Sequence, residues 1–124
     1  MVGRYDNVSE LYVLRIIMMF TDYEKKIMQQ AIDRYGWENQ IDQYHEESAE
    51  LTVALNKARR GHYKPQYIPD ITEEIADVYI MLYQLQQIFN IEQAEINHEM
   101  DRKLTRLEKR MKNEGSEDKG FYKL

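Results

Sequence analysis

Hydrophobic residues recur every three to four positions in four segments of the chain, which cover residues 21–35, 39–60, 70–89 and 92–113. This spacing is typical of amphipathic helices. Only two prolines and five glycines are present, and they fall between the segments and leave little room for a sheet. The pattern predicts an all-α fold, and four helices of this length favour a four-helix-bundle-like arrangement.

Local signals mark the ends of the first two helices. Thr21 and Glu24 have the spacing of a capping box, in which each residue satisfies a backbone N–H near the other. Gly36 is placed to end that helix. The second helix closes with basic residues ahead of Gly61, as the helix dipole favours.

The remaining boundaries follow from prolines and polar residues. Residues 62–69 contain both prolines and are expected to form a loop, after which Asp70 and Glu73 are spaced as a second capping box. Residues 1–20 are expected to be an N-terminal extension holding one short apolar helix. Residues 114–124 are expected to be a flexible polar tail.

Composition narrows the classes of function. A chain of 124 residues and 15.0 kDa fits one domain. Its net charge of −5 argues against unspecific binding to nucleic acid or anionic membranes, and the absence of cysteine excludes disulfides, thiolate metal sites and a cysteine nucleophile. The most apolar run is about half the length of a membrane span. We therefore expect a soluble, unprocessed, cytoplasmic protein.

The second helix carries carboxylates beside its predicted core-facing stripe. Six residues at three-four spacing define that stripe: Ile41, Tyr44, Ser48, Leu51, Leu55 and Ala58. At ~100° per residue, Glu47 lies about 60° from the centre of the stripe and Glu50 about 120° from it, whereas Glu46 points almost directly away. A carboxylate at the edge of an apolar stripe must find a cation or strong donors, or take up a proton.

The third helix repeats this arrangement. Its predicted stripe also has six members: Ile71, Ile75, Val78, Leu82, Leu85 and Phe89. Glu74 lies about 70° from the centre of that stripe and Asp77 about 130° from it, whereas Glu73 faces outward. A short connection makes the two helices antiparallel neighbours, so these two acids can face Glu47 and Glu50.

Four facing carboxylates would repel one another by several kcal/mol unless divalent cations neutralise them. Oxygen ligands select Mg²⁺, Mn²⁺ or Ca²⁺, and Mg²⁺ in proteins is commonly shared with substrate phosphates. The cluster therefore suggests chemistry on phosphate esters or anhydrides. The alternative interpretation is that these acids are surface residues that support helix pairs or helix dipoles.

The runs at residues 46–51 (EESAEL) and 73–78 (EEIADV) resemble the paired signature of the MazG-like all-α nucleoside triphosphate pyrophosphohydrolases, Glu-x-x-Glu followed by Glu-x-x-Asp. The resemblance covers residues 35–110, including a Tyr-Gly-Trp run upstream and Lys-x-x-Arg downstream. It implies a single MazG-like helical domain over residues 1–124, assembled as a homodimer or homotetramer.

The resemblance also implies an activity. Family members cleave nucleoside triphosphates between the α and β phosphates with Mg²⁺ or Mn²⁺, releasing a nucleoside monophosphate and pyrophosphate in a nucleotide-pool or house-cleaning role. By match of motif, Glu47, Glu50, Glu74 and Asp77 would hold the metal. Glu50 would also position the attacking water, with Glu46 as the reserve candidate.

Substrate contacts are implied at both flanks of the acidic motifs. Lys103 and Arg106, one turn apart on the last helix, would neutralise phosphate charge. Trp37 and Gln40 resemble positions that line the nucleobase pocket of the family. Asp101 stands where many relatives carry asparagine, which is a departure from the family pattern.

Rival hypotheses remain open at this level. One is a dUTPase-type or phosphoribosyl-ATP pyrophosphatase activity on the same fold, and another is a non-catalytic helical interaction module whose acids keep it soluble. Walker A, dinucleotide-binding and zinc-protease motifs are absent from the sequence. The helix at residues 70–89 is apolar nearly all round, which favours oligomerisation.

Overall fold

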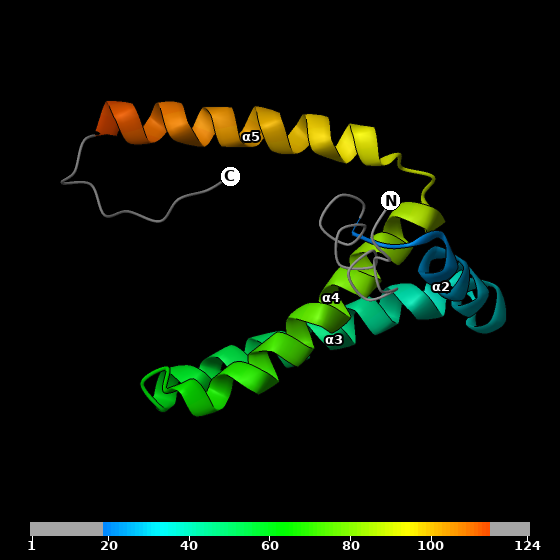
Figure 1. Cartoon of the computed structure of the whole chain (residues 1–124), viewed down its shortest axis with the longest axis horizontal. Coiled ribbons are helices and arrows are strands. Elements are labelled where there is room, and N and C mark those ends of the chain that lie inside the picture. The colour runs from blue at the N-terminus through cyan, green and yellow to red at the C-terminus, as the bar shows by residue number, and fades with distance from the viewer. Residues whose placement is uncertain (1–18, 115–124) are drawn as a thin grey trace, which may run out of the picture. The chain divides into compact units, whose positions relative to one another are not determined.

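The computed structural model describes residues 19–114, and within that range it contains helices and no strand. The all-α prediction is confirmed. The four α-helices and one short 3₁₀ helix (Figure 1) are α2 (Asp22–Tyr35), α3 (Trp37–Arg60), η1 (Pro65–Tyr67), α4 (Ile68–Ile88) and α5 (Gln93–Glu114). The helix expected before Thr21 and all but the first residue of the expected tail fall outside the described residues. None of the described helices is long and apolar enough to cross a membrane.

The chain divides into two compact units, Met1–Ile88 and Phe89–Leu124, and each is described by itself. In the first unit, α3 and α4 run side by side along much of their length, and α2 packs against both of them (Figure 1). The α3–α4 pair forms the framework of the unit because it accounts for most of the packing between helices. It is also the pair that carries the two acidic motifs.

The predicted start and end of α2 are confirmed. The Glu24 backbone N–H donates to Oγ1 of Thr21 at 3.2 Å, and the Thr21 N–H donates to the Glu24 carboxylate at 2.9 Å. Gly36 follows with φ of 93°, a left-handed conformation that a side chain would strain. The chain enters α3 directly after this glycine, so α3 begins at Trp37, two residues before the predicted start.

The predicted capping box at Asp70 is wrong. The helix begins at Ile68, directly after the 3₁₀ turn Pro65–Tyr67, so Asp70 lies within the first turn and not at the N-cap. Pro65 provides the reason, since its fixed φ starts a helical turn earlier than the acidic pair indicates. The Asp70 carboxylate instead approaches the Lys57 ammonium at 4.0 Å across the α3–α4 connection.

The second unit contains α5. Asn90 adopts φ of 52° and separates it from α4, and the Glu92 N–H donates to the Glu95 carboxylate at 2.7 Å at its start. Ion pairs along the helix, such as Arg102 with Glu99 at 2.8 Å, support it locally. Its observed bounds agree with the predicted residues 92–113 to within one residue at each end.

The side of α4 that meets α3 differs from the predicted stripe. Ile75, Leu82 and Phe89 were expected in the core and are exposed, as is Leu55 of the predicted α3 stripe, whereas Met81 and Gln84 are buried. Since α4 is apolar on almost every side, its hydrophobic pattern could not define a single inward direction. The residues toward α3 follow three-four spacing and include both acids: Glu74, Asp77, Met81 and Gln84.

Candidate metal centre

The acidic motifs meet in the seam between α3 and α4. Glu47 and Glu50 lie one turn apart on α3, and Glu74 and Asp77 lie one turn apart on α4. Oxygen atoms from Glu47, Glu50 and Glu74, one from each carboxylate, all lie within 4.8 Å of one another. The antiparallel pairing of the two helices therefore brings three of the four predicted ligands into one group.

Asp77 adjoins the same group through Glu47. Its pKa is raised above the ordinary 3.8, first because the side chain is desolvated and then because the negatively charged Glu47 carboxylate lies next to it. The charge of Asp77 also contributes to raising the pKa of both Glu50 and Glu74. All four predicted ligands thus act on one another electrostatically.

Two carboxylate oxygens at the centre of the cluster lack hydrogen-bond partners. Oε2 of Glu47 and Oε2 of Glu74 are fully shielded from solvent, and neither accepts a hydrogen bond from the described residues. The other oxygen of Glu47 accepts a hydrogen bond of 2.7 Å from Nε2 of Gln43. A buried carboxylate oxygen without a donor is unfavourable, so these two atoms need a proton or a cation.

Mutual repulsion keeps the cluster short of its full negative charge at acidic pH. The pKa of Glu50 is raised chiefly by the neighbouring Glu47 charge and next by desolvation. The pKa of Glu74 is raised chiefly by desolvation and next by the Glu50 charge. A cation placed among these groups would favour the ionised carboxylates and so oppose both shifts.

The donor set fits a hard divalent cation. Two oxygens bound to one Mg²⁺ at about 2.1 Å can lie no more than ~4.2 Å apart, and the corresponding limit for Ca²⁺ is ~4.8 Å. The three oxygens lie within 4.8 Å of one another, which reaches the limit for Ca²⁺ and exceeds that for Mg²⁺, so side-chain rotations would have to draw them closer around one Mg²⁺. The three clustered residues are all carboxylates, which favours Mg²⁺, Mn²⁺ or Ca²⁺ over zinc or copper.

The other predicted residues of the first unit lie around this seam. Glu46 is exposed on α3, as predicted, although its charge still helps to raise the pKa of Glu50. Trp37 is 52% exposed at the start of α3. Gln40 is buried in the seam, where its Nε2 donates to Oε1 of Gln84 at 2.6 Å. Its predicted contact with a nucleobase stays a prediction.

Lys103 and Arg106 lie one turn apart on α5. This helix belongs to the second unit, which is described separately from the carboxylates. Their predicted contact with substrate phosphates therefore stays a prediction.

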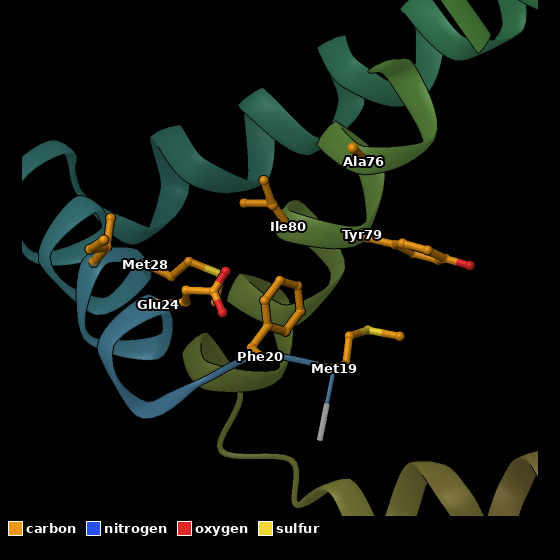
Figure 2. Close-up of a pocket in the computed structure, with 8 residues that line it drawn as sticks. Met19, Phe20, Glu24, Met28, Ala76, Tyr79 and Ile80 are labelled. Carbon is orange, nitrogen blue, oxygen red and sulfur yellow. The ribbon is translucent and has the colours of Figure 1, made fainter. Parts of the chain in front are cut away.

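Two features of the seam and its surroundings were not predicted. The hydrogen bond from Gln43 to the Glu47 carboxylate was missed, although a glutamine four residues before a glutamate on a helix is placed to form one. An apolar hollow of about 540 Å³ between α2 and α4 was also missed. Figure 2 shows Phe20, Met28 and Ile80 around it, and Ala76, the residue before Asp77, lies at its edge.

No protein-family model, curated protein or solved structure matches the chain.

Proposed function

We propose that the protein is a Mg²⁺-dependent nucleoside triphosphate pyrophosphohydrolase. The reaction would consume one water and one nucleoside triphosphate and release a nucleoside monophosphate, pyrophosphate and a proton. The observation that carries the proposal is the carboxylate cluster of Glu47, Glu50 and Glu74, with Asp77 beside it and two buried oxygens without partners. Acidic clusters of this kind on rigid helices suit the binding of metal-phosphate substrates.

Each carboxylate has a role that follows from its environment. Glu47 and Glu74 would hold Mg²⁺ through their unpartnered oxygens, with Asp77 completing the set from α4. Bound Mg²⁺ would neutralise phosphate charge and make a water molecule easier to deprotonate. Glu50 is exposed, and the Glu47 charge raises its pKa, so it is suited to orient that water and accept its proton. Glu46, further toward solvent, is the reserve for this role.

The bond that is cleaved and the substrate contacts rest on the resemblance of the acidic motifs to the MazG-like signature. Cleavage between the α and β phosphates is the reaction of that family. We assign stacking on the base to Trp37, and phosphate contacts to Lys103 and Arg106. We assign to Gln40 a contact with the edge of the base. To make it, Gln40 would have to break its hydrogen bond to Gln84 and bond to the base instead.

Assembly into a homodimer or homotetramer belongs to the same proposal. Large apolar side chains of the helix pair remain exposed, among them Val53, Leu55, Tyr79 and Leu82. Covering such surface with a second copy would complete a four-helix bundle around the seam. A role in maintaining the nucleotide pool implies a cytoplasmic location, where these substrates are found.

Product analysis tests the proposed function. The protein is incubated with a panel of canonical and modified nucleoside triphosphates and Mg²⁺ in ¹⁸O-labelled water. The expected products are monophosphate and pyrophosphate, with the label in one of these two and none in orthophosphate. Asp42→Asn, which removes an exposed acid elsewhere on α3, is the matched control for Glu47→Gln. Orthophosphate release would contradict the proposal. No turnover, together with a melting temperature that Mg²⁺ leaves unchanged, would favour the interaction module.

A further inference from the structure

The hydrogen bond from Gln43 engages only one of the two oxygens of the Glu47 carboxylate. Nε2 of Gln43 donates to Oε1 at 2.7 Å, and Oε2 is left buried without a partner. We infer that Gln43 is a positioning residue, which fixes the Glu47 carboxylate so that Oε2 is presented to the divalent cation. The inference rests on the metal site of the proposed function and adds to it a residue outside the acidic motifs.

Repulsion within the cluster explains why Glu47 needs such a partner. Glu50 lies one turn away on the same helix, and Glu74 and Asp77 approach from α4, so Glu47 has like charges on both sides. Without a donor, its carboxylate would be free to rotate about its last torsion and swing away from these charges. One hydrogen bond from Gln43 removes that freedom.

The chemistry of an amide suits this position. Gln43 is neutral, so it can orient Glu47 without neutralising the charge that attracts a cation, whereas lysine or arginine would compete with the metal. The half-buried side chain also limits competition from water for the same oxygen. Partners of metal ligands that act in this way commonly change metal affinity by about 10- to 100-fold when they are removed.

A second pair in the chain has the same spacing without the same surroundings. Gln29 donates to the Asp33 carboxylate at 2.9 Å, four residues on in α2, but both side chains are exposed. That pair is an ordinary surface contact of a helix. It provides a matched control, because Gln29→Met removes the same kind of bond that Gln43→Met removes.

Binding of Mn²⁺ to the nucleotide-free protein tests the inference. The measurements are Mn²⁺ affinity by electron paramagnetic resonance and the melting temperature without metal. Gln43→Met is expected to bind Mn²⁺ about 10-fold more weakly, and Gln29→Met to bind as the wild type does. Gln43→Asn keeps an amide that is one methylene too short, so it is expected to weaken binding too, and it replaces Gln43→Met should that variant fail to fold.

A double-mutant cycle separates positioning from general loss of structure. In a Glu47→Gln background, the further change Gln43→Met is expected to leave Mn²⁺ affinity unchanged, because the two residues act as one unit. Wild-type Mn²⁺ binding retained within twofold in the folded Gln43 variants would overturn the inference and leave the proposed metal site standing. A wild-type protein that binds no Mn²⁺ would overturn both.

Discussion

Gln40 of α3 and Gln84 of α4 are joined by a 2.6 Å hydrogen bond in a buried part of the seam, where they are 8% and 4% exposed. Replacing one of them leaves the other amide unsatisfied in a buried site. We expect Gln40→Leu or Gln84→Leu to lower the free energy of unfolding by about 1–3 kcal/mol. The measurement is denaturant unfolding of each variant followed by circular dichroism.

The double variant Gln40→Leu/Gln84→Leu is the control for this pair. It removes both polar groups together, so we expect it to be more stable than the sum of the single losses predicts. Additive losses would show that the two amides act independently in the seam.

Removing one charge from the cluster should separate stability from activity. The pKa of Glu50 is raised chiefly by the Glu47 charge, and that of Asp77 is raised first by desolvation and then by the Glu47 charge. Glu50→Gln and Asp77→Asn therefore each remove a charge that the folded protein disfavours. We expect a higher melting temperature without metal and a loss of turnover of about a hundredfold or more. Calorimetry and the product assay measure the two effects, with Asp42→Asn as control. Wild-type rates in both variants would refute the site assignment.

The stability of the metal-free protein should fall as pH rises above about 4.5. Because the pKa of Glu50 and of Glu74 is raised from 4.5, the unfolded chain loses these protons at a lower pH than the folded protein does. Folding then takes up protons, and stability declines from pH 4.5 up to the raised pKa values and stays level above them. Melting curves across this range provide the measurement.

Addition of Mg²⁺ should reverse that trend. The ion binds the ionised carboxylates, so its stabilising effect is expected to be small below pH 4.5 and to grow as these groups lose their protons. An equal shift in melting temperature at all pH values would indicate that Mg²⁺ acts away from the cluster.

The number and bounds of the helices were largely predictable because their signals are local. The Thr21–Glu24 box and the glycine at position 36 act within a few residues, and both appear in the structure as expected. The start of α4 was not predicted, since Pro65 initiates a turn ahead of the acidic pair that suggested a cap at Asp70.

The meeting of the two acidic motifs could be predicted from their spacing and from the antiparallel connection. The polar part of the seam could not, because Gln40 and Gln84 are 44 residues apart and nothing local marks them as partners. Their pairing depends on which side α4 turns toward α3. That direction is ambiguous in a helix that is apolar on nearly every side.

Trp37 offers a direct readout of nucleotide binding, since it is the single tryptophan of the chain and is 52% exposed. If it stacks on the base, a non-hydrolysable nucleotide with Mg²⁺ should change its fluorescence. Loss of a stacked ring costs about 1–3 kcal/mol, so we expect Trp37→Leu to raise KM by roughly five- to 150-fold. Trp37→Tyr keeps an aromatic ring and should stay near the wild type. Unchanged fluorescence and KM would leave Trp37 with a packing role alone.

Tyr79 should be part of the contact between copies of the chain. It is 51% exposed, and it lines the apolar hollow between α2 and α4 together with Ile80. A charge placed on such a surface costs more in an assembled protein than in a monomer, because assembly would remove it from water. We expect light scattering of the wild type to give two or four times the mass of the 15.0 kDa chain, and Tyr79→Glu to shift it toward the monomer.

Tyr63→Glu provides the comparison for this surface, because Tyr63 is a tyrosine in the turn after α3 that is even more exposed than Tyr79 and does not line the hollow. It should leave the mass unchanged, which would show that loss of assembly depends on the location of the charge. A wild type that stays monomeric at micromolar concentration would contradict the proposed assembly. Its exposed apolar side chains would then belong to a different kind of contact.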